Sequence, residues 1–232
     1  MKKQAAIYAT VILATALTMN DSSRNAALAN LCSSTTSCTL VLSEGNTGSG
    51  FGTGNFGTVD LELSGNSVTI NIDLADGFQL VKTGFPGSIG FVDDLGGGLT
   101  IGGFSSSLYS GSLSDASTDL HFDGFGYASN AAATSGPNAG SGLNSLSFNV
   151  AGSGLVDVNE LLQPFGGPAG QGPVYFVADI YNANPSGPGA GNTGLVAVTG
   201  SPTSVPEPGS LAVFGASLVA LGLMPRRSRR RR

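Results

Sequence analysis

Apolar and polar residues alternate with a period of two along much of the middle of the chain. The clearest case is a pair of runs, residues 58–63 (TVDLEL) and 68–74 (VTINIDL), separated by Ser64-Gly65-Asn66-Ser67. Successive side chains of a strand point to opposite faces, so each run has one apolar and one polar face. Glycine and asparagine favour tight turns, and the two runs therefore predict a β-hairpin. Its inward-facing residues are Val59, Leu61 and Leu63 in the first strand, and Val68, Ile70, Ile72 and Leu74 in the second.

Other short apolar runs follow the same pattern, separated by clusters of Gly, Asn, Ser and Pro. They predict strands at residues 39–42, 78–81, 88–92, 99–104, 120–125, 145–150, 174–180 and 195–198. Residues 45–57 and 130–142 are small and polar and are predicted to be loops, and only residues 158–162 suggest a helical turn. Many short strands with turn residues between them are typical of a β-sandwich. We therefore expect residues 30–200 to form one all-β domain, a jelly-roll-like sandwich.

The N-terminus has the features of a secretory signal peptide. A basic start is followed by an apolar stretch at residues 5–17, and small residues stand at Ala27 and Ala29, the two positions that signal peptidase reads. We expect residues 1–29 to be removed after export by the Sec route, so that the mature protein begins at Asn30. Earlier cleavage stays open as an alternative, after Ala14 or Ala16.

Export bears on whether the two cysteines are oxidised to a disulfide. Cys32 and Cys38 are the only cysteines, and five residues lie between them. In an oxidising compartment, two closely spaced cysteines favour a disulfide. A metal pair is the alternative, but no histidine lies nearby and two thiolates do not fill a tetrahedral site. We predict a disulfide that closes a small ring at the start of the mature chain.

Processing at both ends would leave a strongly acidic body. Of the fifteen acidic residues only Asp21 and Glu207 lie outside residues 30–204, which leaves thirteen, against Lys82 as the one basic residue there. Nucleic acids and anionic membrane surfaces are polyanions, so we expect neither to be a partner of the body. Cations and neutral or cationic polysaccharides are compatible with this charge. Alternatively, the net charge serves only to keep the exported protein soluble.

No catalytic arrangement is evident in the sequence, and we predict that the protein is not an enzyme. His121 is the only histidine, and its alternating context places it on the polar face of a strand. Glycoside hydrolysis would need paired carboxylates, for which Asp93-Asp94 or Asp157 with Glu160 are the candidates. Such pairs are ordinary in an acidic domain, so they do not predict an activity.

Calcium is the metal that these loop carboxylates would suit, because it prefers hard oxygen ligands. The candidate ligands are Asp93-Asp94, Asp115 with Asp119, and Asp157-Val158-Asn159-Glu160, and none of them matches an EF-hand loop. We predict no other cofactor, and the sequence does not choose among these carboxylates.

The C-terminus carries three features in a fixed order. After a spacer at residues 201–204, Val205-Pro206-Glu207-Pro208 is held extended by its prolines. Residues 209–225 contain no charged residue and are apolar or small on all sides, which predicts a transmembrane helix. Six arginines follow it and should stop translocation and keep the end in the cytoplasm: Arg226, Arg227, Arg229, Arg230, Arg231 and Arg232.

This order, at residues 205–232, resembles the PEP-CTERM sorting tail of Gram-negative bacteria. The resemblance implies an exported substrate of exosortase, a membrane-embedded transpeptidase or protease that recognises the Pro-Glu-Pro signal and removes the tail. It also implies a link to exopolysaccharide or biofilm production. The protein would be anchored transiently in the inner membrane and then reach the cell surface or the extracellular matrix.

Two other functions stay open at this point. A carbohydrate-binding module would use exposed aromatic rings, for which the candidates are Tyr109, Tyr127, Tyr175 and Tyr181, although the chain has no tryptophan. A bitopic membrane protein would instead keep its C-terminal helix as a permanent anchor.

Overall fold

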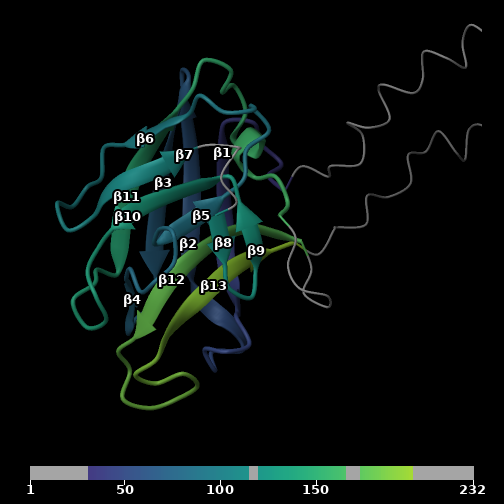
Figure 1. Cartoon of the computed structure of the whole chain (residues 1–232). Helices are drawn as coiled ribbons and strands as arrows, with labels where there is room; N and C mark the ends of the chain where they lie inside the picture. Colours follow the sequence, from purple (N-terminus) through teal and green to yellow (C-terminus); the bar gives the residue numbers. More distant parts are fainter. Residues whose placement is uncertain (1–30, 115–119, 166–172, 201–232) are drawn as a thin grey trace, which may run out of the picture. The chain divides into compact units, whose positions relative to one another are not determined.

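The computed structural model describes residues 31–114, 120–165 and 173–200, which form the body of the chain (Figure 1). The predicted signal peptide, the spacer and the sorting tail lie outside these residues. Within the described part of the chain, no helix is both long and apolar enough to cross a membrane.

The described residues are folded almost entirely as strands. One short 3-10 helix, η1 (Val158–Leu161), interrupts them. The strands are β1 (Ser37–Gly45), β2 (Thr53–Ser64), β3 (Ser67–Leu74), β4 (Phe78–Leu80), β5 (Ile89–Phe91), β6 (Thr100–Gly102), β7 (Ser110–Ser114), β8 (Leu120–Phe122), β9 (Gly126–Ala128), β10 (Asn130–Ser135), β11 (Ser145–Ala151), β12 (Val174–Asn182) and β13 (Thr193–Thr199). The prediction of an all-β body is confirmed.

Eleven of these strands belong to one antiparallel sheet, in the order β6-β11-β3-β2-β1-β13-β12-β5-β10-β7, with β4 paired to β12. The two end strands approach each other, because Ser112 Oγ of β7 donates to the carbonyl oxygen of Ile101 in β6 at 3.1 Å. The sheet is therefore nearly closed on itself. A sandwich of two separate sheets, which the sequence suggested, is not what the described strands form.

The predicted hairpin is confirmed as β2 and β3. Val59 pairs with Ile72, Leu61 with Ile70 and Leu63 with Val68, and the turn between the strands lies at Gly65-Asn66. The apolar side chains of the pair face the core, with Leu63 only partly buried at its edge.

Strands β7, β9 and β10 were not predicted, and the expectation of a loop at residues 45–57 is wrong for residues 53–57, which begin β2. The expectation of a loop at residues 130–142 is wrong for residues 130–135, which form β10 and pair with both β5 and β7. Their sequence, NAAATS, lacks the bulky β-branched and aromatic residues that usually mark a strand. Ala131, Ala132 and Ala133 are fully buried, and a Cβ on the neighbouring Gly87 would overlap the carbonyl oxygen of Ala132, so this part of the sheet is closely packed.

Two hydrophobic cores are built on this sheet. The larger core fills the inside of the curved sheet and draws on both of its halves, with Ile70 and Phe148 on one side and Phe176 and Val196 on the other. The second core lies on the outer face of β12 and β13, where the small β8–β9 sheet covers it. Phe122 of β8 is buried completely there.

No second sheet of the described residues covers the outer face of β1, β2, β3 and β11. Along these strands buried and more exposed residues alternate, as in β3, where every second side chain is buried. One part of the sheet is thus buried on both faces, and the other part presents one face to solvent.

Candidate functional site

The uncovered face of the sheet carries ordered rows of polar side chains. The strand register places Thr39, Asp60, Asn71 and Ser147 side by side on β1, β2, β3 and β11. A second row, Ser37-Glu62-Thr69-Asn149, lies beside it on the same strands. Alternation along each strand therefore becomes a regular polar surface across four strands.

This surface is hollowed into a groove with a volume of about 620 Å³. Its floor comes from β1, β2, β3 and β11, and its walls come from residues 31–34 and from Ser105. Most of the floor side chains are short, namely Ser, Thr, Asn and Asp. Short side chains leave the space between the two walls unfilled.

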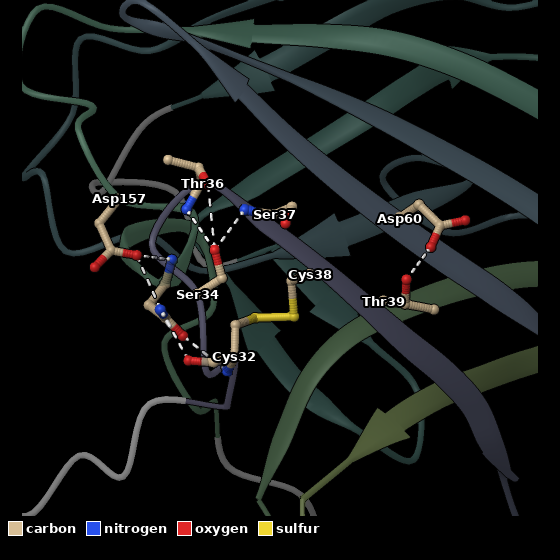
Figure 2. Close-up of a disulfide and its surroundings, with 9 residues drawn as sticks. Cys32, Ser34, Thr36, Ser37, Cys38, Thr39, Asp60 and Asp157 are labelled. Carbon is tan, nitrogen blue, oxygen red and sulfur yellow. Dashed lines mark hydrogen bonds between the residues drawn. A yellow bond between two sulfur atoms is a disulfide. The ribbon is translucent and has the colours of Figure 1, made fainter.

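One wall is the N-terminal loop, which is fixed in several ways (Figure 2). A disulfide joins Cys32 to Cys38 of β1, with the two Cα atoms 5.4 Å apart. The backbone N–H of Cys32 donates to Asn159 Oδ1 at 3.0 Å, which ties the loop to η1. Inside the loop, Ser34 Oγ accepts hydrogen bonds from the backbone N–H groups of Thr36 and Ser37. This wall is therefore held in one conformation.

The opposite wall is formed at Ser105 and is attached to β11. The backbone N–H of Ser105 donates to the carbonyl oxygen of Ser147 at 2.8 Å, and the N–H of Ser147 donates to Ser105 Oγ at 3.0 Å. Both walls are thus bonded to strands or to η1, so the groove is preformed.

The groove is acidic and rich in unused hydrogen-bonding groups. Asp60, Glu62 and Asp73 line it, and none of the described residues that line it is basic or aromatic. Thr39 Oγ1 donates to Asp60, as Figure 2 shows. Within the described residues, the side chains of Glu62, Asn71 and Asp73 have no hydrogen-bond partner in the protein. These groups remain available to a ligand.

Two of the predicted calcium-ligand sets lie close to each other. Burial raises the pKa of Asp94 above its usual range, and the nearby carboxylates of Glu160, Asp93 and Asp157 add to this effect. The backbone N–H of Asp94 also donates to the carbonyl oxygen of Glu160 at 3.1 Å. The fold therefore brings together the two carboxylate sets from distant parts of the sequence.

These carboxylates are used in local hydrogen bonds. Asp157 caps η1 by accepting from the N–H of Asn159, and Glu160 accepts from the N–H of Asp157 in return. Asp93 accepts from Asn130 Nδ2 at 2.6 Å and from the N–H of Leu95. No group of three or more His, Cys, Asp or Glu side chains within the described ranges has an arrangement that could hold a metal ion. The third predicted set, Asp115 with Asp119, lies outside those ranges.

The four candidate tyrosines do not form one surface. Tyr109 is buried, and its hydroxyl donates to the carbonyl oxygen of Leu80 at 2.7 Å, so its role as an exposed sugar platform is wrong. Tyr127 is 55% exposed on β9 and packs against His121 of β8, with ring centroids 4.9 Å apart. Tyr175 and Tyr181 stand near opposite ends of β12, about 20 Å apart along the strand.

One buried acid was not singled out in the sequence. Asp179 lies in β12 and is fully buried, and desolvation raises its pKa to about 6. Its carboxylate accepts hydrogen bonds from the N–H of Thr83 at 2.7 Å and from Thr83 Oγ1 at 2.8 Å. Asp179 thus fastens the segment between β4 and β5 to the outer face of the sheet. The signal for it is a lone acid inside the apolar run VYFVADIYN.

The remaining predicted site residues lie outside the described part of the chain. They are the residues at the signal cleavage site, Ala27 and Ala29, the motif Val205-Pro206-Glu207-Pro208, and the six arginines that begin at Arg226. Of these residues, the sorting motif and the first two arginines fall within a family match.

Residues 204–227 match the model of the PEP-CTERM protein-sorting motif. The match includes the Val-Pro-Glu-Pro sequence, the apolar run behind it and the first two arginines. No curated protein and no solved structure matches the chain. The chain therefore carries a PEP-CTERM sorting motif, as its sequence predicts, and the match extends over this tail alone.

Proposed function

We propose that this protein is an exported, non-enzymatic surface or matrix protein whose C-terminal tail is recognised and processed by exosortase. The observation that carries the proposal is the sorting motif at residues 204–227. The motif begins five residues after Thr199, where β13 ends. The sorting tail therefore follows the folded body almost directly in the sequence.

Each part of the tail has a separate role in this proposal. Pro206 and Pro208 keep the recognition peptide extended, and Glu207 supplies one charge for the enzyme to read. The apolar run at residues 209–225 forms a transmembrane helix, and the arginines behind it fix its orientation. Signal peptidase removes residues 1–29 at the other end, after export by the Sec route.

The body fits a protein that works outside the cytoplasm. Its disulfide between Cys32 and Cys38 suits an oxidising compartment. Its single histidine, His121, packs against Tyr127 on the β8–β9 sheet, and the paired carboxylates around η1 hold backbone groups in place. These contacts favour a binding or structural role. The link to exopolysaccharide in a Gram-negative host is part of the proposal and follows from the resemblance of the tail.

The intact mass of the protein from its native host, measured by cell fraction, tests this function. We expect a species that begins near Asn30 and ends between Val205 and Pro208 in the surface or medium fraction. Glu207→Ala should leave export unchanged and leave most of the protein in the membrane with Arg232 still attached. The matched control is Glu44→Ala, which removes a glutamate from the body and should be processed as the unchanged protein is.

Two results would contradict the proposal. If Glu207→Ala were processed at the normal rate, Glu207 would have no recognition role. If the unchanged protein kept Arg232 in the membrane fraction, the tail would be a permanent anchor and the protein a bitopic membrane protein.

A further inference from the structure

We infer that the acidic groove on β1, β2, β3 and β11 binds a glycan whose sugars carry free amino groups. This inference concerns the body and does not depend on how the tail is processed. It starts from the observation that the groove is preformed, because the disulfide-bonded loop and Ser105 fix its two walls.

The lining of the groove selects for a ligand rich in hydroxyl and amino groups. Serine, threonine and asparagine side chains can both donate and accept hydrogen bonds, and they recur across the four strands of the floor. A polyhydroxylated chain can bond to many of them at once. None of the described residues that line the groove is aromatic, so they offer no ring on which a neutral sugar could stack.

The negative charge in the groove favours a cationic ligand over an anionic one. Asp60, Glu62 and Asp73 line the groove, no described residue of the lining is basic, and Lys82 is the one basic residue between residues 30 and 204. A carboxylate forms its strongest hydrogen bonds with charged donors such as an ammonium group. Polyuronates, phosphorylated glycans and nucleic acids would be repelled by the same groups. Amino sugars supply both the hydroxyl groups and the positive charge.

A cationic peptide is the rival ligand, and the position of the groove disfavours it. Extended peptides often bind by pairing with a free strand edge. The floor strands β2 and β3 are both central, since β2 pairs with β1 and β3, and β3 pairs with β2 and β11. Their backbone N–H and C=O groups are already hydrogen-bonded to neighbouring strands, so a ligand on this face would be bound by side chains alone.

The free side chains identify the residues that would contact the ligand. Glu62 and Asp73 are exposed, lie on neighbouring strands and have no hydrogen-bond partner among the described residues. In this assignment their carboxylates bind the ammonium groups of the sugar chain. Asn71 lies between them on the floor and would bond to hydroxyl groups.

Isothermal titration calorimetry on the full-length chain tests this assignment. The probes are a β-1,4-linked glucosamine hexamer, its fully N-acetylated counterpart, a polyuronate oligomer and a lysine hexapeptide. We expect the glucosamine hexamer to bind, and Glu62→Gln and Asp73→Asn each to weaken it about tenfold, since one charge-assisted hydrogen bond is lost. Glu44→Gln removes a carboxylate outside the groove and should leave the affinity unchanged.

The expected order of the probes makes the test specific. The N-acetylated hexamer and the lysine hexapeptide should bind at least about tenfold more weakly than the glucosamine hexamer, and the polyuronate should not bind. Absence of binding by the glucosamine hexamer would overturn the inference, as would equal weakening by Glu44→Gln. Equal affinity for the N-acetylated hexamer would exclude recognition of free amino groups, and equal affinity for the lysine peptide would show attraction by charge alone; either result would overturn the inference. Thermal unfolding of each variant, expected to match the unchanged protein, verifies that the folded state is retained.

Discussion

The two outer surfaces of the curved sheet differ in what covers them. On β12 and β13 the outer face is buried beneath the β8–β9 sheet, so nearly every side chain of these strands is inaccessible. On β2 and β3 no sheet of the described residues covers the outer face, which we call the bare surface, and polar side chains alternate with buried ones. The same inner core lies beneath both regions. The covered surface therefore adds stability, whereas the bare surface is free to meet a ligand.

The largest contrast is expected from truncating one side chain on each surface. Phe122 is completely buried and its ring lies so close over Gly90 that a Cβ there would overlap it. Phe122→Ala removes a large ring and leaves a cavity, and it should lower the free energy of unfolding by about 3–5 kcal/mol. Asn71→Ala on the bare surface should change it by less than about 0.5 kcal/mol. Urea unfolding of both variants measures the difference, and similar losses would mean that the β8–β9 sheet adds little.

A pH-dependent effect of intermediate size is expected at Asp179. Its folded-state pKa is raised from 3.8 to about 6 by burial, so the folded state holds this proton more tightly than the unfolded chain does. Its contribution to stability is complete below about pH 4 and is lost as the pH rises through about 6. At about 1.4 kcal/mol per pKa unit, the loss is about 3 kcal/mol.

The variant Asp179→Asn isolates this term. Denaturant unfolding between pH 4 and 8 should show that the variant lacks the decline that the unchanged protein has between pH 4 and 6. Asp73→Asn, which removes an exposed carboxylate from the bare surface, controls for the loss of one acid. Parallel pH profiles for the unchanged protein and Asp179→Asn would contradict a raised pKa at this site.

The disulfide at the edge of the bare surface should have a smaller effect on stability than Phe122 or Asp179. The ring that Cys32 and Cys38 close is short, so its loss in a Cys32→Ser, Cys38→Ser variant should lower the free energy of unfolding by about 2 kcal/mol. The same variant should bind the glucosamine hexamer more weakly, because one wall of the groove is no longer fixed. Calorimetry and unfolding of the double variant measure both effects. Unchanged affinity would show that the wall does not need the disulfide.

The same contrast between surfaces explains which strands the sequence predicts. Strand β3, SVTINIDL, alternates because one of its faces meets solvent, and its partner β2 alternates in the same way. Strand β10 has no such pattern, because its small side chains are selected by close packing on both faces. The pattern of apolar and polar residues predicts which face of a strand is exposed to water. It does not predict how closely strands that are distant in the sequence pack together.

The near closure of the sheet also could not be predicted from the sequence. The alternating runs predict strands, and their number suggested two sheets. The pairing of β1 with β13 joins the first and last strands of the body, and only tertiary packing selects it. The two calcium-ligand sets near η1 meet for the same reason, since residues 93–94 and 157–160 are distant in the chain.

The sorting motif and the groove also differ in how far the sequence alone predicts them. The sorting motif is a continuous stretch of sequence, so its residues identify it without a structure. The groove is made from four strands and two walls, and its polar residues are common ones in an exported protein. Only the strand register shows that Asp60, Asn71 and Ser147 form one row.

The pairing of β1 with β13 also sets an order of events in time. Strand β13 lies between β1 and β12 in the sheet, yet it is the last strand of the body, and it ends at Thr199. The chain emerges from the ribosome from its N-terminus, so β1 is complete about 150 residues before β13 exists. The sheet cannot close until almost the whole body has been delivered. Completion of the fold and appearance of the sorting tail are therefore nearly simultaneous, because only a few residues separate them.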